Sequence, residues 1–241
     1  MKRTERRHLK TNELASLTAR ARDVFETRRT PVTAALLAVV VVAGAVIGYV
    51  TWNGRQQSRA YKLLAEALVV EEARVGPAAA PGSPAAATSF ATQREKNQAL
   101  LTKFRAAADG YPSTDAGIFS RYREATTWMA LGNPASAVTA YQEVINRGGS
   151  TVYAVMARLG LAEAQAQSGQ YDQAISTFKE LAQRKDGQVP VDGVLIRLGR
   201  AYLDAGKRAD AEQTFNRLVQ EYPDSPFSSE ARRALEQLKR T

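Results

Sequence analysis

The chain has 241 residues, of which 44% are apolar and 24% are charged, as is ordinary for a folded protein of one or two domains. It has no cysteine and one histidine, His8, which excludes disulfides, thiolate metal sites and histidine-rich zinc sites. Residues 1–30 hold nine basic and four acidic side chains, so much of the net charge of +9 lies there. The remainder is close to charge-balanced and shows no basic stripe, so nucleic-acid binding is not expected.

An apolar run follows the basic lead. No charged residue occurs between Arg29 and Arg55, and residues 32–50 are almost wholly apolar. About twenty helical residues cross the hydrocarbon layer of a membrane. We therefore expect a basic cytoplasmic tail at residues 1–30 and a transmembrane helix at 31–52. A buried helix and a cleaved signal peptide are the alternatives, but the run is longer than either usually needs.

The charge distribution predicts the orientation of this span. Because the long basic lead precedes it, the N-terminus is expected in the cytoplasm and residues 53–241 outside. Gly44 and Gly48 form a Gly-x-x-x-Gly pair, which lets two transmembrane helices approach closely. We regard them as a candidate transmembrane contact, and a homodimer as one of the expected assemblies.

A helical pattern continues beyond the span. Residues 53–75 are expected to form a stalk helix, with an apolar side made of Tyr61, Leu64, Ala65, Leu68 and Val75. Residues 76–91 are rich in Ala and Pro and have mostly small side chains. Such a segment buries too little surface to offset its ordering entropy, so we expect a flexible loop there and a new helix near Thr92.

Internal periodicity is the main signal in residues 92–241. Aromatic, glycine and small-residue columns each recur at a step of 37 residues. The glycines end one helix of each unit with a positive φ, the small residues let two helices approach, and the rings fill the space between neighbouring pairs. Stacked helix–turn–helix units are therefore predicted, closed by a C-terminal capping helix. The columns are Phe104, Tyr141, Phe178 and Phe215; Gly132, Gly169 and Gly206; and Ala137, Ala174 and Ala211.

These units resemble tetratricopeptide repeats. The best match is the last unit, where Leu198, Gly199, Tyr202, Gly206, Ala211, Phe215, Leu218 and Pro223 occupy that family's characteristic places. The first unit has Glu124 where Leu is usual. The expected fold class is all-α: a single transmembrane helix followed by an α-solenoid of tetratricopeptide-like repeats.

Catalytic motifs are not evident. Gly206-Lys207 is followed by Arg208 rather than by the Ser or Thr of a phosphate-binding loop. Carboxylates such as Glu124, Glu143, Glu163 and Asp172 are interpreted as solvated helix residues. We therefore predict a non-enzymatic protein without a cofactor or metal.

In tetratricopeptide repeats the first helix of each pair lines a concave surface. The resemblance places a largely apolar set of side chains there, which suits adaptable contacts with exposed segments of a protein partner. The alternative is that these residues belong to the core. The candidates are Phe119, Tyr122, Thr126, Met129, Met156, Leu159, Glu163, Ile196, Arg200 and Leu203.

The order of segments resembles the YfgM-like family, ancillary subunits of the bacterial Sec translocon, most closely at residues 45–60 (AVIGYVTWNGRQQSRA). The resemblance implies an inner-membrane protein with a periplasmic repeat domain that helps pass secreted proteins to periplasmic chaperones. Translocon subunits, chaperones and unfolded clients would be its partners. Residues 221–227 (EYPDSPF) instead resemble repeat ends of envelope-assembly and cell-division-coordinating proteins. A self-associating membrane scaffold is the third alternative.

Overall fold

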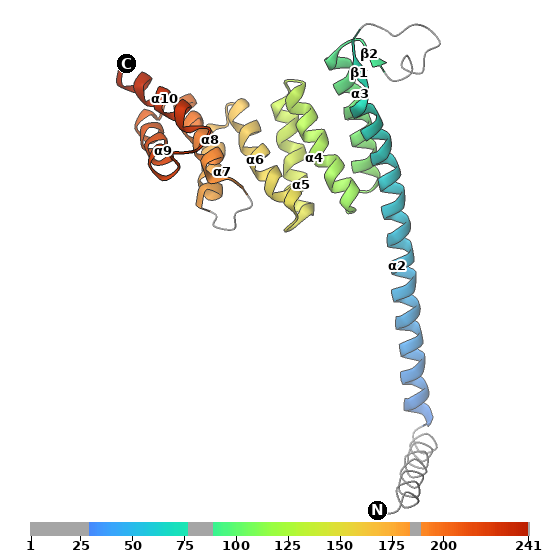
Figure 1. The fold of residues 1–241 in the computed structure, drawn as a ribbon. Helices are drawn as coiled ribbons and strands as arrows, with labels where there is room; N and C mark the ends of the chain where they lie inside the picture. The colour runs from blue at the N-terminus through green and yellow to red at the C-terminus, as the bar shows by residue number, and fades with distance from the viewer. Residues whose placement is uncertain (1–28, 77–88, 184–188, 241) are drawn as a thin grey trace, which may run out of the picture. The chain divides into compact units, whose positions relative to one another are not determined.

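The computed structural model describes residues 29–76, 89–183 and 189–240 (Figure 1). Residues 1–28 of the predicted basic tail and most of the Ala/Pro loop lie outside the described residues. In the described part, the chain is helical except for one pair of two-residue strands. The elements are α2 (Arg29–Glu72), β1 (Arg74–Val75), β2 (Ser89–Phe90), α3 (Gln93–Gly110), α4 (Asp115–Ala130), α5 (Pro134–Gly148), α6 (Val152–Gln167), α7 (Tyr171–Gln183), α8 (Val191–Asp204), α9 (Arg208–Glu221) and α10 (Ser228–Arg240).

The chain divides into two units, Met1–Arg55 and Gln56–Thr241. The described part of the first unit is the apolar portion of α2. It contains an 18-residue window of mean hydropathy 2.4, none of which is buried. Side chains such as Leu37 and Val41 are 66% and 68% exposed. By length and composition this helix can span a membrane.

The second unit consists of helical pairs stacked in chain order. Helices α5, α7 and α9 begin at Pro134, Tyr171 and Arg208, and so repeat at the predicted step. The turns before them contain glycines with φ of 75°, 78° and 73°, a conformation that disfavours any residue with a Cβ. The fold class is therefore confirmed as a tetratricopeptide-like solenoid. The turn glycines are Gly132, Gly169 and Gly206.

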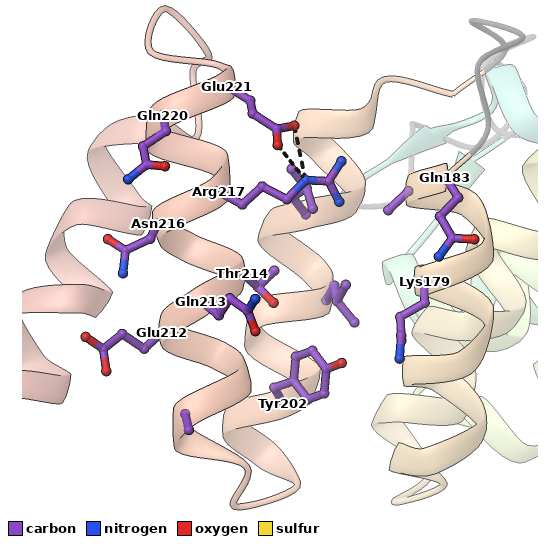
Figure 2. A pocket seen from close by; sticks show the side chains of 14 residues that line it. Lys179, Gln183, Tyr202, Glu212, Gln213, Thr214, Asn216, Arg217, Gln220 and Glu221 are labelled. Atoms are coloured by element: carbon purple, nitrogen blue, oxygen red, sulfur yellow. Dashed lines mark hydrogen bonds and ion pairs between the residues drawn. The ribbon is translucent and has the colours of Figure 1, made fainter.

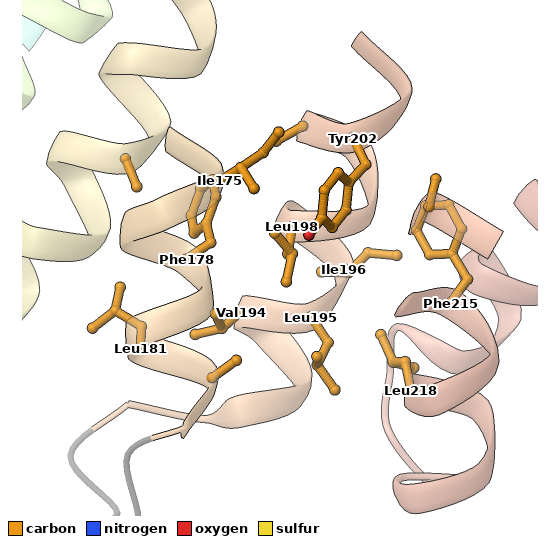
Figure 3. Close-up of a cluster of buried hydrophobic side chains, with 14 of the residues drawn as sticks. Ile175, Phe178, Leu181, Val194, Leu195, Ile196, Leu198, Tyr202, Phe215 and Leu218 are labelled. Atoms are coloured by element: carbon orange, nitrogen blue, oxygen red, sulfur yellow. The ribbon is translucent and has the colours of Figure 1, made fainter. Parts of the chain in front are cut away.

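The repeating rings lie in the core, as their period predicts. Phe104 and Phe178 are completely buried, Phe215 is 1% exposed and Tyr141 is 4% exposed. Figure 3 shows how α7, α8 and α9 bring Phe178, Leu198 and Phe215 into one cluster. The ring of Phe215 lies against Gly199, where a Cβ would come within 2.2 Å of the ring edge. Small residues on first helices thus make room for the rings of second helices.

The C-terminal part of α2 belongs to this core. Ala60, Leu64 and Ala67 are buried in a cluster with Leu100, Phe104 and Ala116 of α3 and α4. The Lys103 ammonium donates to Glu66 Oε2 at 2.9 Å, Arg123 pairs with Glu71, and Lys96 Nζ donates to the Ala73 carbonyl at 2.7 Å. The segment that we expected to be a stalk therefore supplies the first helix of the first repeat.

The buried face of this segment differs from the one we expected. Of the five side chains assigned to its apolar side, only Leu64 is buried, and the others, Tyr61 and Leu68 among them at 53% and 39%, are exposed. Ala60 and Ala67 let α2 approach its neighbours, so packing selects their face. After α2, β1 pairs in parallel with β2, with Val75 opposite Phe90.

Glu124 corrects the interpretation of the acidic side chains as solvated. It is only 2% exposed. Its carboxylate pairs with Arg121 and accepts a hydrogen bond from Trp128 Nε1 at 3.3 Å. Arg121 also pairs with Asp109 of α3 and with Glu143 of α5. Burial alone would lower the pKa of Arg121, but its hydrogen bond to Asp109 and the charge of Glu124 raise it above the usual range. Arg121, paired with the buried carboxylate that replaces the usual leucine, thus links α4 to α3 and α5.

Candidate protein-binding surface

The candidate residues lie on the first helices of three successive repeats. Helix α4 begins where Thr114 Oγ1 accepts from the Gly117 N–H at 3.0 Å, and α6 begins where Thr151 Oγ1 accepts from the Ala154 N–H at 3.3 Å. These caps set where each helix starts and hence which side chains share a side. Phe119, Tyr122 and Met129 lie on α4, Met156, Leu159 and Glu163 on α6, and Ile196, Arg200 and Leu203 on α8.

Aromatic rings connect α4 to α6. The Phe119 ring centre lies 5.1 Å from that of Tyr153, and Tyr122 lies 6.2 Å from Tyr153 and 6.0 Å from Tyr141. Burial raises the pKa of Tyr122 and of Tyr141, so both rings stay protonated over the physiological range. Tyr153 was not among the predicted residues. Its position three residues before Met156 on the same helix could have identified it.

The most accessible apolar side chains of this region lie on α6. Met156 is 42% exposed and Val152, one turn earlier, is 57% exposed. Leu159 is half-buried and packs on the core that α7 and α8 share. These side chains, together with the half-buried and mutually contacting rings of Phe119 and Tyr153, are called the α4–α6 surface. Exposed apolar areas of this kind are typical of protein contact sites.

Other candidates serve the packing of the array. Ile196 is 1% exposed and is a core residue, so it is not accessible to a partner. Met129 and Leu203 are half-buried and pack on neighbouring core clusters. Glu163 pairs with Arg197 of α8, and Arg200 Nε donates to Glu230 of α10 at 2.7 Å. These ion pairs connect successive first helices. Thr126 is half-buried on α4, where its hydroxyl donates to the Arg123 carbonyl at 2.8 Å.

The candidate transmembrane contact lies on the apolar portion of α2. Gly44 and Gly48 are exposed, and a Cβ built at either would meet nothing within 4 Å. Neither glycine is therefore required by contacts within the described chain. Both positions are open to close approach by another helix.

A hollow that the sequence did not predict opens between α7 and α9, apart from the α4–α6 surface. It encloses about 670 Å³. Leu195, Leu198 and Tyr202 line it from α8. Figure 2 shows Tyr202 together with the polar side chains of α7 and α9. The Arg217 guanidinium donates to Glu221 at 2.9 Å along its rim. The polar walls of the hollow include Gln183 of α7 and Gln213, Asn216 and Gln220 of α9. In the sequence, only the spacing of the three amides on α9 indicated such a wall.

Neither surface carries a recognisable catalytic arrangement. The α4–α6 surface is aromatic and aliphatic, and the hollow combines apolar side chains of α8 with amides and charged side chains of α7 and α9. Within residues 33–76, 89–183 and 189–240, no group of three or more His, Asp or Glu side chains could hold a metal ion. Both surfaces are suited to protein contact.

Comparison with known proteins places this architecture. Residues 31–239 match the family described as tetratricopeptide repeat-like domain. The sequence matches none of the curated proteins. Among solved structures, it is similar in fold to nearly identical TPR-like repeats from a Podosopora anserina protein described as a kinesin light chain. That chain has 14% identity and a TM-score of 0.53, and the match covers 61% of this chain and 80% of the other.

A second crystal structure of the same Podosopora anserina repeats, with one substitution, has 15% identity and a TM-score of 0.50 and covers 61% and 87% of the two chains. At such identities the likeness concerns the fold alone. Repeats of this family are typically non-enzymatic and mediate contacts between proteins. Because the family match extends over most of the sequence, this chain belongs to the tetratricopeptide repeat-like domain family.

Proposed function

We propose that this protein is a membrane-anchored scaffold that holds exposed segments of client proteins on its α4–α6 surface. The observation that carries the proposal is the exposure of Met156 and Val152 on α6, the helix whose Tyr153 contacts Phe119 of α4. A folded repeat gains nothing from leaving such side chains in water, whereas an adaptable apolar contact needs them.

The anchor and the resemblance to the YfgM-like family suggest where the clients come from. In this proposal the apolar part of α2 spans the bacterial inner membrane with the N-terminus in the cytoplasm. The repeats then lie in the periplasm, next to the Sec translocon, and help pass secreted proteins to periplasmic chaperones. An envelope-assembly or cell-division role is the competing proposal, based on residues 221–227.

Photo-crosslinking tests the client surface. A photoreactive residue at Met156 should capture translocon subunits or unfolded secreted proteins in intact cells. The same residue at Ser176, which is exposed on α7 away from this surface, is the matched control. Capture of a folded assembly machine at Met156 would support the competing role. Equal capture at both positions would count against any specific site.

Topology is tested separately. A reporter enzyme that is active only outside the cytoplasm, fused after Thr241, should be active. The same reporter fused to a chain that lacks residues 1–55 should be inactive, because no span remains to export it. An inactive full-length fusion made in normal amounts would contradict the periplasmic orientation.

A further inference from the structure

The outer face of α2 carries apolar side chains that the repeats do not use. Tyr61 and Val69 are 53% and 57% exposed, Leu68 is 39% exposed, and Ala65 is exposed between them. These positions fall at i, i+4, i+7 and i+8, so they share one side of the helix. We call this face the outer α2 strip.

The other side of the helix is already occupied. Ala60, Leu64 and Ala67 are buried against α3 and α4, and Glu66 and Glu71 pair with cations of those helices. The repeats therefore hold α2 without help from the outer α2 strip. An apolar strip left open on a well-packed helix indicates a docking surface.

The spacing along α2 identifies the occupant as another helix. Uncharged residues recur from Gly44 to Leu68 with steps of three and four in strict alternation. The charged residues within that stretch, Arg55, Arg59, Lys62 and Glu66, all fall outside the series. This is the pattern of a helix that packs along a partner helix at a shallow angle. The series is Gly44, Ile47, Thr51, Gly54, Ser58, Tyr61, Ala65 and Leu68.

A second copy of this chain meets that requirement. If α2 spans the membrane, every copy crosses it in the same direction, so two α2 helices run parallel and in register. The same strip then faces itself, as in a two-fold symmetric contact. Small residues at Ser58 and Ala65 alternate with large ones at Tyr61 and Leu68, which lets the two helices approach closely.

We infer that the outer α2 strip is the contact of a parallel homodimer. The contact extends the Gly44/Gly48 pairing beyond the apolar portion of α2 and so rests on the proposed membrane anchorage. Its occupant is neither a client nor the translocon.

The absence of cysteine makes a direct test possible. Single substitutions Ser58→Cys and Ala65→Cys lie in the series, whereas Gln56→Cys and Arg59→Cys lie on the outward positions of such a pair and are the controls. Mild oxidation of membranes that contain the full chain should yield a covalent dimer of twice 26.2 kDa. Yields at 58 and 65 should exceed those at 56 and 59 by about fivefold or more.

A second variant distinguishes loss of the dimer from misfolding of the chain. Leu68→Lys changes an exposed side chain, so the repeats should fold while the dimer yield of Ser58→Cys falls several-fold. Equal yields at all four positions, or an adduct of another mass, would overturn the homodimer. A chain that stays in carbonate-washed membranes without crosslinking refutes only the dimer. A chain released from those membranes refutes the anchor.

Discussion

Helices α2 and α10 are the first and last helices of the repeat unit, and their outer faces differ. Ala231 of α10 is completely buried, while Arg232, Arg233 and Glu236 are exposed. The outer face of α2 instead exposes Tyr61, Leu68 and Val69. A terminal repeat needs one apolar side and one polar side to remain soluble. Helix α10 satisfies this requirement and α2 does not, so the apolar outer face of α2 calls for a partner.

The largest loss of stability is expected from a substitution in the core between α2 and α10. Phe178→Ala should lower the free energy of unfolding of the repeat unit by about 3–5 kcal/mol, because the ring is completely buried between α7 and α8. Urea unfolding measures the change. A loss below about 1 kcal/mol would mean that the ring column does not support the array.

The two faces of α2 can be compared by one type of substitution. Leu64→Ala removes a side chain that is 7% exposed and should cost about 2–4 kcal/mol. Leu68→Ala, one turn away and 39% exposed, should cost less than about 1 kcal/mol. Denaturation of the two variants side by side checks this. Equal losses would show that the outer face is also part of the fold.

The ion network that links α3, α4 and α5 should respond differently from an apolar core. Glu124→Leu restores the family's usual residue but leaves Arg121 buried with fewer partners, so we expect a loss of about 2 kcal/mol. The double variant Arg121→Met/Glu124→Leu should recover much of this loss, because neither charge remains buried. A double variant less stable than the single one would contradict this account.

The smallest effect is expected at alkaline pH. Burial raises the pKa of Tyr141 in the folded chain, so its contribution is complete below the unfolded value of about 10 and is lost as the pH rises above it. Tyr141→Phe should reduce the fall in the thermal midpoint between neutral and strongly alkaline pH. An unchanged slope would assign that fall to other tyrosines, such as Tyr122.

The sequence predicted the repeats because their chemistry is local. Gly169 and Gly206 mark turns that need positive φ, and the 37-residue step places Phe178 and Phe215 in equivalent cores. The apolar run of α2 was equally predictable, because the length of a helix and its lack of charged residues are enough to show that it can span a membrane. Candidate surface residues were less predictable. Met156 is exposed, but Ile196, which corresponds to Leu159 in the next repeat, is covered by its neighbours.

By itself, then, the sequence determined the helical period, the turns and the apolar span, because each depends on residues close together in the chain. Only the tertiary structure decided that residues 56–72 form the first repeat helix, that Glu124 is buried in an ion pair with Arg121 and that Ile196 belongs to the core. Those outcomes depend on which face of one helix meets another. That choice is made by packing between segments that lie far apart in the sequence.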